Sequence, residues 1–502
     1  MHGPTEQIRA DKGLGLYKFC SSLVLFSLMA LFLVAALLRL DLSILVLCLM
    51  SIGTTFMTLR AVNTLRLAFR IRGMVKRYGR AFDAATAKPL AWRHAIVIPI
   101  YKESIETIGR TIANLAHQQA AKTNYVILCA HEKTDPDHDE KFRRMHEQYA
   151  AGFLGFEKSV HVIVPSECPG KAPNVNCAVR QFAASQPRET YATTMITVID
   201  CDTLIDERYF RELERLAATV ADPHCVVLAA PAFFESNRLQ VPCFVRGMDD
   251  LWSMGAAANI FSNSRLGFPI SNYSLSLKMA DELGYWDVDY DSVGEDFHMF
   301  VKASVTLNKD VRMVPVAVPM NNENVEGHTY QKSLLARYAQ SMRHALGIAS
   351  TAYLLRHVLA APTSLRKWIL LLLCYEAHTL PQLYLASGLY VTASIWLGNF
   401  GTYFHDGKFT LFLTLGAIAG IAGNIVFTTY KLTQFYVRHV VFGQPRNLPV
   451  EIHADACDLC VQTVCGFGYF VIPFGYRMLQ NLAFRTNKVY YNKFEESSRK
   501  HR

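Results

Sequence analysis

Charged residues are scarce in this sequence. Asp, Glu, Lys and Arg make up 19% of its 502 residues, whereas apolar residues make up 51%. Soluble domains contain about 25% charged residues, and disordered chains are poor in apolar ones. The composition therefore excludes a disordered protein and argues against an entirely soluble one. The sequence also lacks internal repeats and low-complexity tracts, so the chain is not expected to form a solenoid or a fibre.

A disulfide framework is not expected either. The chain has 12 cysteines, but most lie in apolar runs or in the polar middle of the sequence, where free thiols are the default. Four residues, His453, Cys457, Cys460 and Cys465, have spacings that could seat a zinc ion. Inert or palmitoylated thiols are an equal alternative beside a membrane, so the sequence leaves zinc binding open.

The apolar residues gather towards the two ends of the chain. Residues 19–38 carry no charge and are long enough to cross the hydrocarbon core of a bilayer, which is about 30 Å thick. Residues 42–59 are just long enough to return, so residues 1–59 are predicted to form a transmembrane hairpin. A cleaved signal peptide fits less well, because a second apolar run follows at once.

A basic segment follows the hairpin. Residues 60–90 are rich in Arg and Lys interleaved with apolar side chains, which is typical of an interfacial helix beside anionic membrane lipids. Positive charge marks the cytoplasmic side of a membrane protein, and much of the net charge of +9 reflects this topology. Nucleic-acid binding is not expected, since no aromatic platform accompanies the charges.

The middle of the chain is predicted to lie in the cytosol. Residues 91–347 contain no run that could cross a bilayer, and an interfacial helix is expected at 348–367. Residues 368–484 are predicted to be partly transmembrane and partly interfacial, and a basic tail occupies 485–502. The sequence thus predicts a multi-pass integral membrane protein of the plasma membrane, endoplasmic reticulum or Golgi, with its polar domain in the cytosol.

The number of C-terminal spans decides where the tail lies. Residues 368–397 and 409–430 are predicted spans, whereas residues 457–484 are interrupted by Pro473 and Arg477. We predict four spans in all, with this last stretch re-entrant or interfacial and the basic tail in the cytosol. A fifth span would place the tail outside.

The polar domain has the pattern of an α/β fold. Short apolar runs rich in β-branched residues alternate with helical patterns, at residues 94–100, 124–130, 160–164, 195–199 and 225–230. This alternation predicts a mainly parallel sheet covered by helices on both faces. Ligands of such sheets bind beyond the carboxyl ends of the strands, where Asp200 and Asp202 follow the fourth run. Two carboxylates so placed can hold Mg²⁺ or Mn²⁺ against a diphosphate, although an isolated Asp-x-Asp also occurs in caps and turns.

Five motifs stand in an order that resembles a known family. They are Val-Ile-Pro-Ile-Tyr-Lys-Glu at 97–103, Gly-Lys-Ala-Pro-Asn-Val-Asn at 170–176, Asp-Cys-Asp at 200–202, Gly-Glu-Asp at 294–296 and Gln-Ser-Met-Arg-His at 340–344. Together they resemble the processive family-2 glycosyltransferases, the membrane-embedded group that contains cellulose, chitin and hyaluronan synthases. The resemblance covers about residues 91–347 and implies a GT-A fold for the cytosolic domain.

The resemblance also implies roles for individual residues. Those expected to bind the UDP-sugar donor are Pro99, Tyr101, Glu103, Glu132, Lys171, Asp200, Asp202 and Arg343. Asp200 and Asp202 would also hold the Mg²⁺ or Mn²⁺ ion, and Glu295, Gln340 and His344 would contact the acceptor. Asp296 would be the catalytic base, since an inverting transfer needs a carboxylate to take the proton of the acceptor hydroxyl. Without the other motifs, Asp296 could simply be a carboxylate at a helix N-terminus.

Some positions depart from the family pattern. Glu132 is a substitute for an aspartate-rich contact, and Phe-Pro-Ile-Ser-Asn-Tyr at 268–273 stands where relatives have an aromatic residue and Cys-Gly. His344 replaces a tryptophan that would stack on the terminal sugar, and the Phe-x-Val-Thr-x-Lys gating loop is missing. These departures concern the acceptor and the polymer more than the donor.

The predicted function is an inverting hexosyltransferase that passes a sugar from a UDP-sugar to a growing polysaccharide and translocates the product. Glu376 and His378, inside a predicted span, would face a hydrated path or make a polar contact between helices. The nearest alternative is a single transfer to a lipid acceptor such as ceramide or a polyprenyl phosphate. A nucleotide-binding transporter or scaffold is the remote alternative.

Overall fold

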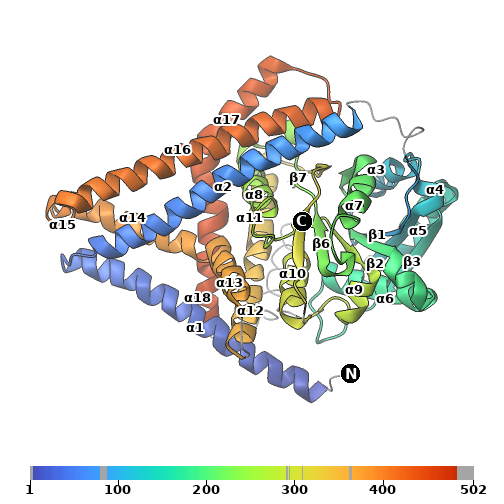
Figure 1. The fold of residues 1–502 in the computed structure, drawn as a ribbon, viewed down its shortest axis with the longest axis horizontal. Helices are drawn as coiled ribbons and strands as arrows, with labels where there is room; N and C mark the ends of the chain where they lie inside the picture. The colour runs from blue at the N-terminus through green and yellow to red at the C-terminus, as the bar shows by residue number, and fades with distance from the viewer. Residues whose placement is uncertain are drawn as a thin grey trace. The chain divides into compact units, whose positions relative to one another are not determined.

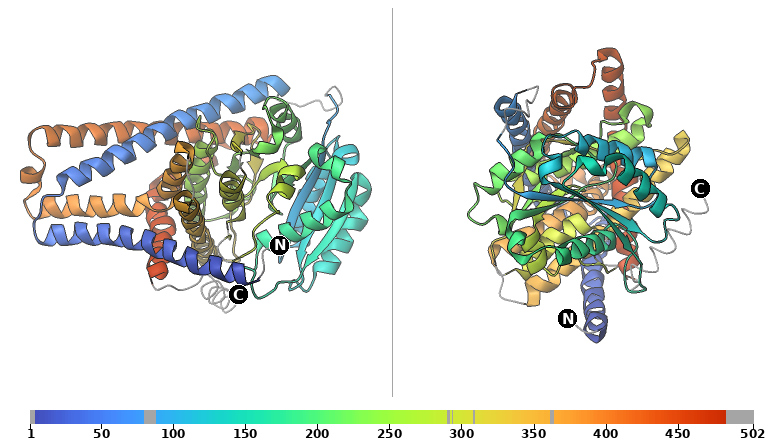
Figure 2. Two further views of the ribbon diagram at one scale, coloured as in Figure 1. Left: turned by 60° about the horizontal axis from the view of Figure 1, so that its bottom comes forward. Right: turned by 90° about the vertical axis from the view of Figure 1, so that its right-hand side faces the viewer.

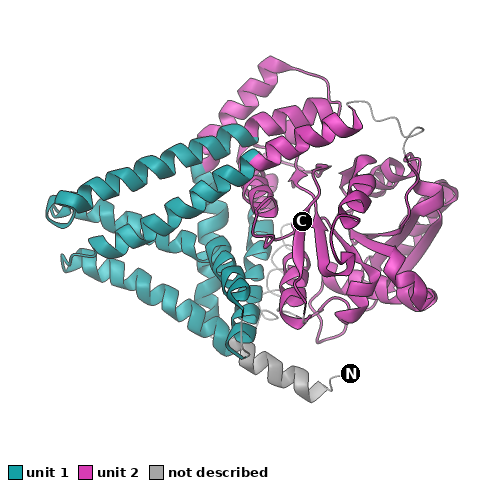
Figure 3. Ribbon diagram, viewed as in Figure 1, with its two compact units in different colours: residues 1–65, 338–430, 463–502 teal, residues 66–337, 431–462 magenta. Residues whose placement is uncertain are grey.

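A computed structural model describes residues 4–79, 88–289, 292, 294–307, 309–360 and 364–482, with only the backbone described before residue 16. The predicted basic tail at 485–502 therefore lies outside the described residues. The chain divides into two compact units (Figure 3). The first contains Met1–Leu65, Tyr338–Tyr430 and Thr463–Arg502, and the second contains Arg66–Arg337 and Lys431–Gln462.

The second unit is built on a seven-stranded sheet of order β3-β2-β1-β4-β8-β6-β9 (Figure 1). Its strands are β1 (Arg93–Ile100), β2 (Tyr125–Glu132), β3 (Gly155–His161), β4 (Thr194–Val198), β6 (Val226–Ala229), β8 (Tyr273–Ser276) and β9 (Arg312–Pro315). Only β8 runs antiparallel to its neighbours, which are β4 and β6. The predicted α/β class is confirmed. The sheet is mixed because β8 runs antiparallel, and β8 lies outside the runs that were predicted to form strands.

Helices cover both faces of this sheet, as the second view of Figure 2 shows. They are α3 (Ile105–Ala116), α4 (Ala121–Asn124), α5 (His138–Tyr149), α6 (Lys171–Ser185), α7 (Arg208–Ala217), α8 (Cys243–Ile260), α9 (Leu277–Glu282) and α10 (Glu295–Thr306). The first follows the sequence pattern closely, because the Ser104 side chain accepts a hydrogen bond from the backbone N–H of Thr107 and so caps the helix. Its apolar side chains Ile108, Ile112 and Leu115 are buried.

A second, three-stranded sheet lies in the same unit. Its order is β5-β10-β7, with β5 at Leu204–Ile205, β7 at Ala232–Phe233 and β10 at Met320–Asn321. The strand β5 follows directly after Asp200 and Asp202, so this small sheet fixes one end of the Asp-x-Asp segment.

The remaining helices differ in length and polarity, and several of them are long and apolar. They are α1 (Pro4–Leu37), α2 (Ser43–Tyr78), α11 (Tyr330–His344), α12 (Ile348–Ala360), α13 (Leu365–His378), α14 (Leu380–Trp396), α15 (Phe400–Tyr403), α16 (Asp406–Tyr436), α17 (Leu448–Gly466) and α18 (Ile472–Leu482). Among the described residues, four stretches are long and apolar enough to cross a membrane: Leu16–Leu37, Ser43–Tyr78, Asp406–Val441 and Leu448–Leu482. The bent pair α13–α14 would be a fifth.

The irregular helices are not the ones that we expected. Residues 368–397 were predicted to form one span, but α13 and α14 meet at 57°. The cause is Pro381, which lacks an N–H and clashes with the carbonyl one turn earlier. The last apolar stretch is more regular than predicted, since a π-helical turn at Phe467–Val471 leads from α17 directly into α18 and accommodates Pro473.

Glu376 and His378 make contacts between elements of the first unit. A guanidinium nitrogen of Arg60 on α2 lies 2.6 Å from the Glu376 carboxylate, which is buried. The His378 ring stacks on Phe474 with a centroid separation of 5.6 Å, and its Nδ1 lies 3.0 Å from the carbonyl oxygen of Cys374. Of the two readings of these residues, the geometry favours a polar contact between helices.

The topology can be tested at the C-terminus. Arg66–Arg337 and Lys431–Gln462 belong to one unit, so the predicted topology places an even number of crossings between them. The expected crossings are α16 and the bent pair α13–α14. A protease-cleavable tag after residue 502 should be cut on the same side as a tag in the polar domain, since the tail is basic. Protection of the first tag alone, in sealed vesicles, would mean that α17–α18 is a fifth span.

Candidate active site

Acidic side chains gather at the carboxyl ends of the parallel strands. After β1, a Glu103 carboxylate oxygen accepts a 2.7 Å hydrogen bond from the backbone N–H of Tyr101. After β4 comes the turn with Asp200 and Asp202, closed by a 3.1 Å hydrogen bond from the Thr203 N–H to the Asp200 carbonyl. The sheet therefore brings these carboxylates to one edge, as the motif positions predict.

The Asp-x-Asp turn suits a divalent cation. Among the described residues, Oδ1 of Asp202 is buried without a hydrogen-bond partner. Burial, together with the nearby charges of Asp200 and Glu103, raises the pKa of Asp202. A cation would relieve both effects. No three described His, Cys, Asp or Glu side chains gather as a metal site, but Mg²⁺ and Mn²⁺ commonly take one or two carboxylates and complete their shell with phosphates and water.

Lys171 links the carboxylates to one another. It opens α6 after Gly170, whose φ of 142° lies in a region that favours glycine. Its Nζ lies 2.8 Å from Oδ1 of Asp200 and 3.0 Å from Oε1 of Glu295. Burial lowers the pKa of Lys171, but the surrounding carboxylates outweigh it, so the net shift is upward and the ammonium stays charged.

Asp296 is held rigidly at the start of α10. Its Oδ1 accepts a 2.8 Å hydrogen bond from the N–H of Phe297, and its Oδ2 accepts a 2.6 Å bond from the N–H of Ser271. Burial nevertheless raises the pKa of Asp296 above its ordinary value. The neighbouring Glu295 is 6% exposed, and burial together with the charges of Asp296 and Asp200 raises its pKa to about 8. Both carboxyl groups are therefore suited to exchanging protons.

Ser271 and Asn272, which were not among the predicted site residues, join these parts. The Ser271 N–H binds Asp296, and the Ser271 carbonyl accepts a 2.8 Å hydrogen bond from Lys171. Oδ1 of Asn272 accepts a 3.2 Å bond from the N–H of Asp200. Ser271 has a φ of 59°, which is unusual for a residue with a side chain. The pair stands within the segment that departs from the family pattern, and only that departure hinted at its importance.

Other predicted donor contacts lie at the same strand ends. Pro99 is part of β1 and pairs with Ala130 of β2. Glu132 ends β2, is 3% exposed, and accepts a hydrogen bond from the Thr134 hydroxyl. The structure thus places Glu132 in the interior at the strand end, and its role towards a nucleotide stays a prediction.

The predicted acceptor motif at residues 340–344 lies in the first unit. Gln340, Arg343 and His344 occupy the last turns of α11, beyond the boundary at residue 337, so their relation to Asp296 stays a prediction. The start of α11 is anchored in the second unit, where the buried Arg337 Nε lies 2.9 Å from Oδ1 of Asp249.

The candidate zinc residues do not form a metal group in the described part of the chain, although Sγ of Cys457 lies 3.7 Å from Nε2 of His453.

Residues 195–427 match the family model described as Glycosyl transferase family group 2. The matched segment includes Asp200, Asp202, Asp296 and the 340–344 motif. It supports the family-2 resemblance that the ordered motifs predicted. No curated protein sequence matches the chain.

Solved structures give weaker likenesses. The mannosyltransferase PcManGT from Pyrobaculum calidifontis, in complex with GDP-Man and Mn²⁺, is 15% identical with a TM-score of 0.44, and the alignment covers 79% of this chain and all of that one. Residues 1–349 of TarS from S. aureus, in complex with UDP-GlcNAc, are 16% identical with a TM-score of 0.36, covering 71% of this chain and 93% of that one.

The metal assignment predicts the behaviour of Asp202→Asn. The amide keeps the shape but removes a ligand charge, so affinity for a nucleotide with Mn²⁺ should fall at least ~10-fold. An acid whose folded pKa is raised destabilises the fold above its unfolded pKa, so the melting temperature at pH 7.5 should not fall. Calorimetric titration with UDP and GDP checks affinity, with the exposed Asp139→Asn as control. Unchanged affinity in Asp202→Asn would contradict the assignment of a metal site to this turn.

Proposed function

We propose that the chain is a membrane-embedded inverting glycosyltransferase that passes a hexose from a UDP-sugar to a growing polysaccharide and moves the product across the membrane. The observation that supports this most is one connected cluster, in which Lys171 and Ser271 tie the Asp-x-Asp turn to Asp296. A transporter or a scaffold that merely bound nucleotide would need the turn but not a fixed carboxylate beside it.

Each group has a task in this reaction. The Lys171 ammonium and the Asp-x-Asp turn would hold the diphosphate of the donor, and a divalent cation bound there would neutralise the leaving group. Both oxygens of Asp296 accept backbone hydrogen bonds, so the carboxylate cannot rotate away from an incoming acceptor hydroxyl. It would take the proton of that hydroxyl as the sugar carbon is attacked. Arg343 would supply charge to the departing diphosphate.

The acceptor is the less constrained part of the proposal. Gln340, His344 and Glu295 would border the terminal sugar of the polysaccharide. A single transfer to a lipid acceptor is the second candidate, and His344 favours it, because a histidine offers a smaller stacking surface than a tryptophan. Product size separates the two.

The direct test uses the purified protein in lipid vesicles. Separate incubations with UDP-sugars and GDP-sugars, each with Mn²⁺ or Mg²⁺, should release UDP from one UDP-sugar and yield a product that grows with time. A product of fixed mass that extracts with the lipids would support the lipid acceptor. Absence of nucleotide release from every donor would contradict the proposal as a whole.

Asp296→Asn should separate binding from chemistry. The variant keeps the size of the side chain, although its amide nitrogen cannot accept one of the two backbone hydrogen bonds that fix Asp296. Affinity for UDP with Mn²⁺ should change little, because Asp296 is not proposed to contact the nucleotide, while transfer should fall at least ~10²-fold because the general base is lost. Near-normal turnover would mean that another carboxylate, with Glu295 as the first candidate, takes the proton.

The pH profile provides a second readout of the same base. Because burial raises the pKa of Asp296, the base becomes protonated, and transfer declines, at a higher pH than for an ordinary aspartate. The rate under saturating donor should therefore rise with pH through this pKa. The residual rate of Asp296→Asn should lack that rise, and an identical rise in the variant would assign it to another group.

Alanine substitutions at His344 and Arg343 should affect transfer and donor hydrolysis differently. His344→Ala should impair transfer to the acceptor more than hydrolysis of the donor, since its proposed contact is the terminal sugar. Arg343→Ala should impair both activities, since its proposed contact is the diphosphate. Equal loss of both activities in both variants, with weaker donor binding in each, would place His344 at the nucleotide instead.

A further inference from the structure

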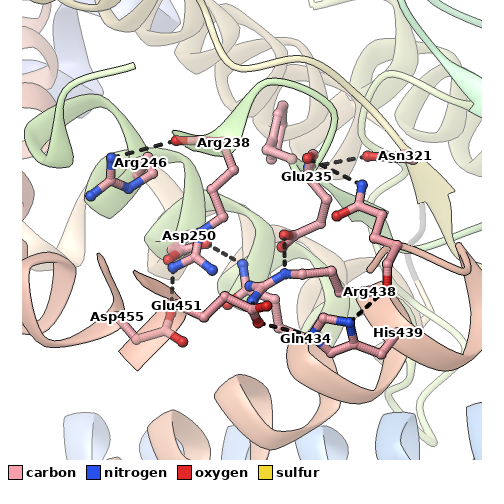
Figure 4. A network of polar contacts seen from close by, with 12 residues as sticks. Glu235, Arg238, Arg246, Asp250, Asn321, Gln434, Arg438, His439, Glu451 and Asp455 are labelled. Atoms are coloured by element: carbon pink, nitrogen blue, oxygen red, sulfur yellow. Dashed lines mark hydrogen bonds and ion pairs between the residues drawn. The ribbon is translucent and has the colours of Figure 1, made fainter. Parts of the chain in front are cut away.

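Buried charges connect the helical segment Lys431–Gln462 to the remainder of the second unit (Figure 4). The cations are Arg238, Arg246, Lys431 and Arg438, and the carboxylates are Glu235, Asp250, Glu451, Asp455 and Asp458. Four positive charges thus face five negative ones, and His439 adds a polar contact to Glu451. Removing one partner of a buried pair leaves the other charge uncompensated, so this network specifies how the segment docks.

The Arg438–Glu235 pair is the part of this network that leads towards the active site. Nε of Arg438 donates a 2.7 Å hydrogen bond to Oε2 of Glu235, and the other side of its guanidinium binds Glu451. Glu235 lies just beyond β7 of the three-stranded sheet, and its backbone N–H donates a 3.1 Å bond to Oδ1 of Asn321. Asn321 ends β10, the central strand of that sheet.

The next residue continues the path to the Asp-x-Asp turn. Oδ1 of Asn322 accepts a 3.1 Å hydrogen bond from Nδ2 of Asn272, which is 0% exposed. Oδ1 of Asn272 in turn accepts bonds from the N–H of Asp200, at 3.2 Å, and from the hydroxyl of Thr203, at 3.4 Å. The turn is therefore held from both ends, by β5 after it and by the Asn272 amide before it.

We propose that Asn272 is a positioning residue for the Asp-x-Asp turn, and that the buried Arg438–Glu235 pair sets its position through Asn321 and Asn322. The contact of Arg438 with Glu235, rather than the docking network as a whole, then controls the geometry with which Asp200 and Asp202 meet a metal–nucleotide ligand. The inference rests on the proposed function only for the identity of that ligand. Asn272 touches no reacting atom; it acts through the backbone of Asp200.

The first test measures affinity for UDP and GDP with Mn²⁺ by calorimetry. Asn272→Ala should weaken binding about tenfold, the equivalent of one buried hydrogen bond, and Asn322→Ala and Arg438→Gln should each weaken it about threefold. Arg438→Lys keeps a cation beside Glu235 and should recover part of the loss. The matched control is Lys431→Gln, which removes a cation of the same network that contacts Asp250 and Asp455 but not Glu235.

The second test needs no nucleotide. Hydrogen exchange of the peptide covering residues 199–205 should be faster in Asn272→Ala, Asn322→Ala and Arg438→Gln than in the wild type, and unchanged in Lys431→Gln. Melting temperatures in the same detergent show whether each variant is folded. If exchange and affinity change equally in all four variants, or in none, the path is wrong and the network only stabilises the fold.

The two measurements also separate this inference from the proposed function. In one outcome, the wild-type protein binds neither nucleotide, while exchange is faster in the three path variants and not in Lys431→Gln. That result would contradict the proposed glycosyltransferase and support the positioning role. Normal nucleotide binding in Asn272→Ala, with unchanged exchange, would contradict the positioning role and leave the glycosyltransferase in place.

Discussion

The ammonium of Lys171 is the contact on which the candidate site depends. Asp200, Glu295 and Asp296 would repel one another at the edge of the sheet if no cation stood among them. Lys171 pairs with the first two and also binds the Ser271 carbonyl, so one side chain draws α6, α10 and the loop before β8 together. A cation in this position keeps the carboxylates close together, so that they could hold a divalent cation, and that cation would stabilise a negatively charged leaving group.

Lys171 does not compensate all the negative charge of the cluster, and the uncompensated charge of Asp202 suits a cationic ligand. Oδ1 of Asp202 is buried without a hydrogen-bond partner among the described residues, and burial raises the pKa of Asp202 although the charge of Lys171 acts in the opposite direction. An unrelieved carboxylate in a folded protein lowers stability, and such groups concentrate where a ligand later supplies the missing charge. In the proposed function, Lys171 balances the carboxylates beside it, whereas a bound cation would balance Asp202.

The sequence was sufficient for the features that depend on local pattern. Short β-branched runs predicted β1, β2, β4 and β6, and the rule that ligands bind beyond strand ends singled out Asp200 and Asp202. Lys171 and Asp296 were expected beside them only through the family resemblance. The sequence was insufficient where tertiary contacts decide. The runs gave no sign of the antiparallel β8, and the bend between α13 and α14 depends on one proline. The Arg438–Glu235 pair joins residues about 200 positions apart, which no periodicity reveals.

In the proposed reaction, the anchoring of Asp296 also limits how an acceptor can approach. Its two oxygens are fixed by backbone N–H groups of Ser271 and Phe297, so the carboxylate offers one direction of approach. A base that cannot move accepts a proton only from a hydroxyl brought to it, and the alignment must come from groups that hold the rest of the acceptor. In this proposal the donor would be held at the sheet edge, whereas the acceptor would be selected by elements outside it. A change of acceptor could therefore evolve by substitution on those elements, such as His344 on α11, without disturbing the charge balance around Lys171.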